Sequence, residues 1–141
     1  MKSYRDLEIY SMSKRLVVEV HKITLILPKF ELFEEGSQLR RSSKAITAMI
    51  VEGYCRRRYK ADFIKYLIYA QAECDETIVY LDFLFETKSW RDKQSYDKLR
   101  EEYLLLSKKI NKYIQWVEDN WKRFSEKNTE IPTVVRGTGQ Q

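Results

Sequence analysis

Residues 92–123, DKQSYDKLREEYLLLSKKINKYIQWVEDNWKR, are the stretch of sequence that decides the fold class. Large apolar side chains recur in it every three or four residues: Tyr96, Leu99, Tyr103, Leu106, Ile110, Tyr113, Val117 and Trp121. This spacing places them along one face of an α-helix, which has about 3.6 residues per turn. An apolar face sustained over so many turns predicts a long helix that packs against other helices.

Three earlier segments carry the same helical period. We expect helices at about residues 6–27, 37–58 and 61–87, in addition to the one at 92–123, and no segment shows the alternation of a half-buried strand. Short connections between long helices favour antiparallel neighbours. The sequence therefore predicts an all-α fold, an antiparallel up-down-up-down four-helix bundle over residues 1–124. From residue 125 the helical period is lost, and residues 125–141 are expected to form a flexible polar tail.

The composition favours a cytoplasmic protein. No apolar run approaches the roughly 20 residues that a membrane-spanning helix needs. The opening residues, MKSYRDLEIY, include acids where a signal peptide has an apolar segment. Cys55 and Cys74 lack the spacing of a metal site or redox motif, which is typical of reduced thiols in packing roles. We therefore expect no membrane partner, no disulfide and no bound metal.

A second apolar stripe on the expected third helix predicts self-association. Besides its core-facing positions, this helix carries Ile64, Ile68, Ala72, Val79 and Phe83. A helix that is apolar on two sides must be covered on both, and in a four-helix bundle only one face points inward. These residues are therefore a candidate interface between subunits, and Trp90 and Trp116 are further apolar groups that could lie at such a contact. The alternative is an irregular bundle that buries both stripes within one chain.

The positive charge is concentrated in the second expected helix and its exit turn. Residues 37–60 hold seven basic residues and one acid, a net charge of +6, which leaves −1 for the remainder of a chain whose total is +5. The basic residues are Arg40, Arg41, Lys44, Arg56, Arg57, Arg58 and Lys60. Guanidinium groups bind phosphates in a bidentate manner, and the flanking Tyr54 and Tyr59 could stack on unpaired bases. The segment is a candidate nucleic-acid-binding surface; the alternative is a solvated helix end whose cations complement the helix dipole.

The sequence shows no catalytic motif. His21 is the sole histidine and has no acid or cysteine at a matching spacing. Gly-rich phosphate loops and the motifs of zinc proteases and serine hydrolases are absent. Glu73, Asp75 and Glu76 could serve acid–base chemistry if they were buried together, but the alternative is that they face solvent or pair with basic side chains. We expect no enzymatic activity and no cofactor.

Three motifs carry a family resemblance: SQLRRSS at residues 37–43, IVEG at 50–53 and RRRYKADFIKYL at 56–67. With them, residues 4–120 resemble the four-helix bundle proteins encoded within intervening sequences of bacterial 23S ribosomal RNA genes, also labelled S23 ribosomal proteins. The resemblance implies a left-handed bundle that assembles as a homopentameric ring, with no known enzymatic activity. It also implies a relation to the accessory proteins of diversity-generating retroelements, whose basic surface works with a reverse transcriptase and its template RNA.

The chain departs from the family pattern around Glu52. The family usually has Ser and Asn at the positions of Ala45 and Met49, Gly at that of Cys55, and Ser at that of Glu73. A polar cluster expected beside Glu52 is therefore partly apolar in this chain, which puts any shared binding role of that cluster in doubt.

Glu52 and Gly53 are interpreted as structural residues of the second helix. Glycine inside a helix costs about 1 kcal/mol relative to alanine, and a close approach of another helix would explain its presence. Glu52 is placed to form an ion pair with Arg41 or Arg56. The alternative is that Glu52 belongs to a ligand site.

Three functions follow as hypotheses. The first is a homo-oligomeric protein that binds RNA or another nucleic acid through the basic segment. The second is a protein-interaction scaffold or an accessory subunit of a reverse transcriptase. The third, an enzymatic or small-molecule site around Glu52 and Glu73, has the least support.

Overall fold

The structure, a computed structural model, describes residues 3–127, and it describes side chains for residues 3–121. Four long helices make up most of this part of the chain: α1 (Glu8–Leu25), α2 (Glu35–Cys55), α3 (Lys60–Glu86) and α4 (Lys93–Lys127). Two short 3-10 helices, η1 (Tyr4–Asp6) and η2 (Lys29–Leu32), precede α1 and α2. No strand occurs within residues 3–127, which confirms the all-α prediction.

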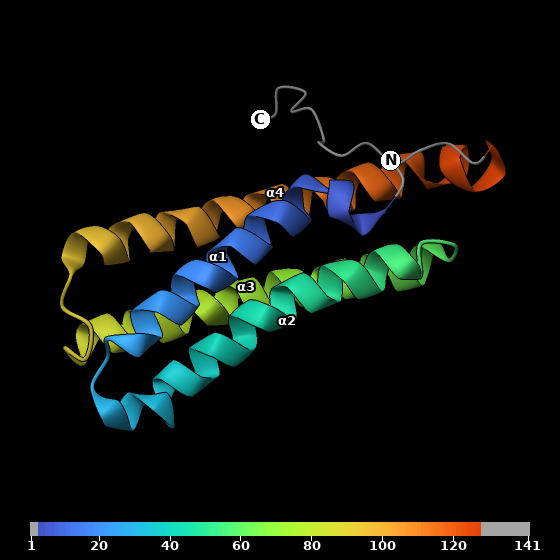
Figure 1. Cartoon of the computed structure of the whole chain (residues 1–141). Coiled ribbons are helices and arrows are strands. Elements are labelled where there is room, and N and C mark those ends of the chain that lie inside the picture. The colour runs from blue at the N-terminus through green and yellow to red at the C-terminus, as the bar shows by residue number, and fades with distance from the viewer. Residues whose placement is uncertain (1–2, 128–141) are drawn as a thin grey trace.

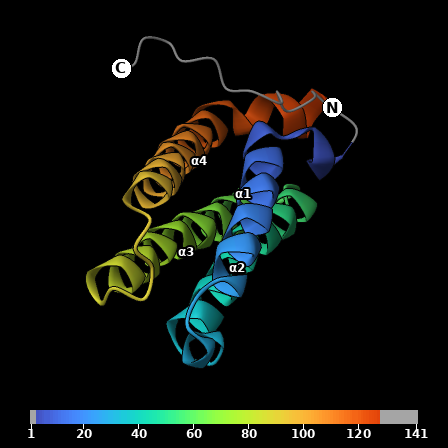
Figure 2. The same ribbon diagram turned by 60° about the vertical axis from the view of Figure 1, so that its left-hand side comes forward.

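The four helices lie side by side, and the chain turns back at each connection (Figure 1). Each helix packs against the next along the chain, and α4 returns to α1, so the contacts form a closed circle of four neighbours. The α2–α3 pair makes the most extensive contact. The end of α4 passes the start of α1 (Figure 2). This circular packing is that of a four-helix bundle; its left-handed sense and the ring of subunits stay predictions.

The core is built from the apolar stripe of each helix. Burying these side chains removes apolar surface from water, which supplies most of the free energy that holds helices together. The largest fully buried residues come from all four helices and from the segment before α1: Leu7, Leu16, Leu39, Ile46, Ile50, Phe63, Leu67, Leu81, Leu84, Tyr103, Leu106 and Tyr113.

Two hydroxyl pairs tie α2 to its neighbours inside this apolar interior. The Ser42 and Thr77 hydroxyls lie 2.8 Å apart across the α2–α3 contact. The Thr47 hydroxyl donates to that of Ser13 at 2.9 Å across the α1–α2 contact. Buried polar groups are tolerated when they are paired in this way.

α2 ends at Cys55, a few residues earlier than the end at 58 expected from the sequence. The Arg56 amide donates to the carbonyl oxygens of Glu52 and Gly53, which closes the last turn of the helix. Tyr59 then has an extended backbone, and α3 begins at Lys60. The three consecutive arginines therefore lie in a turn at one end of the bundle and not on the helix itself.

α4 begins after Asp92, whose carboxylate accepts hydrogen bonds from the amide and the hydroxyl of Ser95. These bonds cap the helix and hold the pKa of Asp92 below its usual value. α4 continues to Lys127, beyond the end at 123 expected from the sequence. The remainder of the expected polar tail, residues 128–141, lies outside the described residues.

Trp90 belongs to the core, and its predicted place at a subunit contact is wrong. Its side chain is 3% exposed and packs edge-on against Tyr96, with ring centroids 5.9 Å apart. The chain reaches this position through Lys88, which has a left-handed backbone (φ 65°) and lets the amide of Trp90 donate to the carbonyl of Leu84. Trp116 is half-buried against the same core.

Within residues 3–127, no helix combines the length and the apolar character that crossing a membrane requires.

Candidate nucleic-acid interface

The α2–α3 turn holds four basic residues in a short ordered loop. The Tyr59 amide donates to the carbonyl of Arg56 at 3.0 Å, and the amide of Phe63 donates to the carbonyl of Tyr59 at 3.0 Å. Arg56, Arg57 and Arg58 are exposed between these bonds, as is Lys60 at the start of α3. Backbone hydrogen bonds thus hold the turn in one conformation, with its cations toward solvent.

Arg56 is the most constrained of these cations. Its Nε donates to Glu52 at 2.6 Å, one of its terminal nitrogens lies 3.5 Å from Asp62, and its guanidinium carbon lies 5.1 Å from the centre of the Tyr66 ring. The hydrogen bond to Glu52 raises the pKa of Arg56. Of the two ion-pair partners expected for Glu52, the structure shows Arg56.

Arg57 lies over the ring of Tyr54, with its guanidinium carbon 4.0 Å from the centre of the ring. It also donates to the Tyr54 carbonyl at 3.0 Å, while the indole of Trp121 donates to the carbonyl of Arg57 at 3.3 Å. Tyr54 is only 6% exposed. It therefore anchors Arg57 to the core and offers no free face for a base, contrary to the role expected from the sequence.

Arg58, Tyr59 and Lys60 are exposed, and the structure adds neighbours on the first turns of α3 that sequence reasoning missed. The ammonium of Lys65 lies 5.3 Å from the centre of the Tyr66 ring, and Tyr69 packs edge-on against Tyr66. Among the side chains of residues 3–121, no carboxylate forms an ion pair with Arg58, Lys60 or Lys65. In the sequence, these neighbours could have been found from the basic and aromatic residues at positions 65, 66 and 69.

The basic residues of α2 itself do not belong to this surface. Arg40 is half-buried and donates to the carbonyl of Leu32 at 2.6 Å, so it fastens η2 to α2. Its position is about 24 Å from Arg56 along the helix axis, at about 1.5 Å per residue. Lys44 is exposed between the two sites. The positive charge of residues 37–60 is therefore divided between the body of α2 and the α2–α3 turn.

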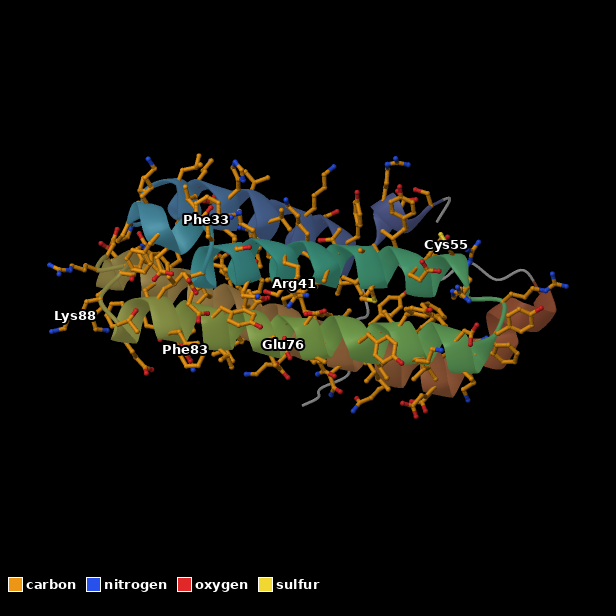
Figure 3. All side chains as sticks on the ribbon, turned by 90° about the horizontal axis from the view of Figure 1, so that it is seen from below. Phe33, Arg41, Cys55, Glu76, Phe83 and Lys88 are labelled. Carbon is orange, nitrogen blue, oxygen red and sulfur yellow. The ribbon has the colours of Figure 1, made fainter. Side chains whose placement is uncertain are left out.

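Arg41 bridges α2 and α3 in the middle of the bundle, where Figure 3 shows it beside Glu76. Its guanidinium lies 3.7 Å from Glu73 and 3.9 Å from Glu76. Burial, with the charge of Glu76 next, raises the pKa of Glu73, and one of its carboxylate oxygens is buried without a hydrogen-bond partner among the described groups. Asp75 instead accepts a hydrogen bond from Ser107 on α4 at 3.3 Å.

The three neighbouring acids in the middle of α3, at positions 73, 75 and 76, therefore face two different helices. Glu73 and Glu76 face α2, whereas Asp75 faces α4. No group of His, Cys, Asp and Glu within the described residues is arranged to hold a metal ion.

The Cys74 thiol has a packing role. Burial raises its pKa to about 12, and it donates to the carbonyl of Tyr103 at 3.2 Å.

Gly53 lies at a close approach between α2 and α3. A Cβ added there would lie 3.2 Å from the Cβ of Tyr66 and 3.3 Å from the carbonyl oxygen of Phe63. These distances are tighter than ordinary van der Waals contacts. The glycine thus serves the close helix approach expected from the sequence. Ala45 and Met49, which replace the family's polar residues, are half-buried on the same helix.

The second apolar stripe of α3 is largely uncovered. Ile68 is 49% exposed, and Val79 and Phe83 are each 45% exposed. Ala72 is exposed as well, while Ile64 is half-buried against the core. The alternative expectation, an irregular bundle that buries both stripes within one chain, is not what the structure shows for Ile68, Val79 and Phe83.

The described residues form a small four-helix protein with a basic turn between α2 and α3. Residues 5–112 match the model of the 23S rRNA-intervening sequence protein family. Since the match covers most of the chain, the protein belongs to that family.

A solved structure has the same fold. It is the crystal structure of a protein with unknown function from the S23 ribosomal protein family of Bacteroides thetaiotaomicron VPI-5482. The TM-score is 0.68 at 24% sequence identity, and the similar region covers 76% of this chain and 95% of that one. At this identity the similarity shows the fold alone. No curated protein matches the chain significantly in sequence.

Proposed function

We propose that the protein is a non-enzymatic, homo-oligomeric subunit that binds RNA through the α2–α3 turn. The observation that carries the proposal is the group of exposed cations formed by Arg57, Arg58, Lys60 and Lys65, close in the chain to the exposed rings of Tyr59 and Tyr69. Arginine and lysine contacts to phosphates supply most of the affinity in sequence-independent nucleic-acid binding. Their position at one end of a rigid bundle leaves them accessible to a long ligand.

Self-association would multiply this surface. The uncovered stripe of α3 (Ile68, Ala72, Val79 and Phe83) supports a contact between copies, because a soluble monomer gains nothing from keeping large apolar groups in water. A closed ring, with the five subunits that the family resemblance implies, would repeat the basic turn once per subunit. Repeated weak sites on one ligand raise the apparent affinity even when each site binds as before.

The experiment measures RNA affinity as a function of salt. The variant Arg58→Gln/Lys60→Gln removes two exposed cations from the turn. It is expected to weaken binding of every RNA sequence tested. It is also expected to reduce the slope of the logarithm of the binding constant against the logarithm of the salt concentration by about one for each phosphate that the variant no longer binds. The matched control, Lys22→Gln/Lys29→Gln, removes the same charge from exposed lysines at and after the end of α1.

Unchanged affinity in the turn variant, or an equal loss in the control, would show that this surface does not bind RNA.

The proposal places the protein in the cytoplasm, and the two free thiols support a reducing location.

A protein-interaction scaffold is the second candidate, and one observation favours it. The end of α1 and its connection to α2 expose four large apolar side chains: Leu25 at 65%, Ile26 at 76%, Phe30 at 60% and Phe33 at 82%. Figure 3 shows Phe33 at the end of the bundle opposite Cys55, which marks the basic turn. A partner protein, such as a reverse transcriptase served by an accessory subunit, would bind there in a salt-tolerant manner and would leave the basic turn free.

A further inference from the structure

The tyrosines around the basic turn differ in how much of each ring is available. Tyr59 is 61% exposed and Tyr69 is 47% exposed. Tyr66, between them in the sequence, is half-buried; it touches Tyr69 edge-on, with ring centroids 5.6 Å apart and planes at 83°. Tyr59, just before α3, and Tyr69, on α3, are therefore the exposed rings, and Tyr66 contacts one of them, Tyr69.

Cations already surround the middle ring. The guanidinium carbon of Arg56 lies 5.1 Å and the ammonium of Lys65 lies 5.3 Å from the centre of Tyr66. Both contacts are in the range of cation–π attraction. At the turn, Arg58 lies 5.9 Å from the centre of Tyr59. The exposed ring of Tyr59 thus has a cation beside it, and the ring of Tyr69 packs edge-on against Tyr66, which carries two. The phosphate next to a stacked base would find a counter-charge among these groups.

This combination distinguishes single strands from duplexes. In a double helix the bases are stacked on one another and their faces are closed to side chains, so exposed aromatic rings contribute nothing to duplex binding. An unpaired base can leave its neighbours and stack on a tyrosine, while the strand's phosphates contact lysine and arginine. Positions 59 and 69 are about 15 Å apart along the helix axis at about 1.5 Å per residue, so one strand can reach both rings.

We propose that the turn and the first turns of α3 bind unpaired nucleotides, with bases stacked on Tyr59 and Tyr69 and phosphates held by Arg58, Lys60 and Lys65. The inference rests on the proposed RNA-binding function and narrows its substrate to single-stranded segments. The affinity of the site for a duplex is then limited to phosphate contacts.

The test uses fluorescence anisotropy with the full-length protein. The probes are a short labelled RNA of unstructured sequence and the same strand annealed to its complement. The wild-type protein is expected to bind the single strand at least about tenfold more tightly. Tyr59→Leu and Tyr69→Leu, which keep apolar bulk and remove the ring, are each expected to weaken single-strand binding by about fivefold or more. Neither change is expected to affect duplex binding.

Tyr80→Leu is the matched control. Tyr80 is a half-buried tyrosine on the same helix, and its hydroxyl bonds to Glu76 at 3.3 Å outside the basic cluster. Its replacement is expected to leave both affinities unchanged, and far-ultraviolet circular dichroism checks that every variant remains helical.

The outcomes separate this inference from the function on which it rests. If duplex and single strand bind equally, or if the Tyr59 and Tyr69 changes leave single-strand affinity intact, the stacking inference is wrong, while weaker binding by Arg58→Gln/Lys60→Gln would still support RNA binding. If neither probe binds, the proposed RNA function fails together with the inference.

Discussion

Single residues at two points of α2 set how closely its neighbours approach. A Cβ at Gly36 would overlap the backbone carbonyl oxygen of Glu31, which cannot rotate away. At Gly53 a Cβ would meet the Cβ of Tyr66 and the carbonyl of Phe63 at slightly longer distances. The first glycine lets η2 fold back onto α2, and the second lets α3 pack against it.

Gly36→Ala is expected to lower the free energy of unfolding by about 1–3 kcal/mol, because the cost of overpacking exceeds the gain of about 1 kcal/mol in helix propensity. Gly53→Ala is expected to have a smaller effect in the same direction. Urea denaturation of both variants measures the difference. A Gly36→Ala variant more stable than the wild type would contradict the close contact between Glu31 and α2.

Glu73 makes the stability of the protein depend on pH. Burial and the charge of Glu76 raise its pKa above the ordinary value of 4.5. A carboxyl group whose pKa is raised by folding stabilises the fold in its protonated form. This contribution is complete below about pH 4.5 and disappears as the pH rises through the folded value.

Glu73→Gln is therefore expected to raise stability at neutral pH by about 0.5 kcal/mol, the size of a like-charge repulsion along a helix, and to flatten the pH profile on the acid side. Thermal unfolding at several pH values measures the change in stability and its pH dependence, with Glu76→Gln as the comparison. A loss of stability at neutral pH would mean that the Arg41–Glu73 ion pair outweighs burial and repulsion.

At the scale of the elements, the helices themselves were predictable because their apolar stripes repeat every three or four residues. The ends of α2 and α4 were less predictable, because a basic turn and a polar helix end have similar composition. Tyr54 was expected at the binding surface, yet it follows Ile50 by four residues and so continues the core stripe. Arg40 was expected there too, but its partner is a carbonyl of η2 that no local pattern reveals.

The α3–α4 connection is held by a network around Tyr96. Its ring stacks on Phe85 with centroids 4.2 Å apart, and its hydroxyl donates to Asp82 at 2.5 Å, which also accepts from Arg100 at 3.0 Å. Burial and the bond to Asp82 raise the pKa of Tyr96 to about 12.

Tyr96→Phe keeps the stacked ring and removes the hydroxyl. It is expected to lower the free energy of unfolding by about 1 kcal/mol, the usual contribution of one such hydrogen bond. Thermal unfolding near neutral pH measures the change, and Tyr80→Phe serves as a comparison on a half-buried tyrosine of α3. An unchanged melting temperature would show that the hydroxyl of Tyr96 contributes nothing to the α3–α4 packing.

At the scale of the whole molecule, the uncovered stripe of α3 is the surface proposed to form the contact between copies of this chain. If copies of this chain cover it, Val79→Asp/Phe83→Asp is expected to convert an oligomer into a monomer that remains helical, because buried charges cost several kcal/mol without a partner. Light scattering after size-exclusion chromatography gives the mass. Val18→Asp, at a site on α1 that is 50% exposed, is the control and is expected to leave the mass unchanged.

The most direct test of RNA binding by an oligomer is the solution mass of the freshly purified full-length protein, with its ratio of nucleic-acid to protein absorbance, at low and at high salt. An oligomer that carries nucleic acid at low salt and releases it at high salt, while its protein mass stays constant, is the predicted result. A monomer free of nucleic acid at both salt concentrations would contradict both the assembly and the binding surface proposed for it.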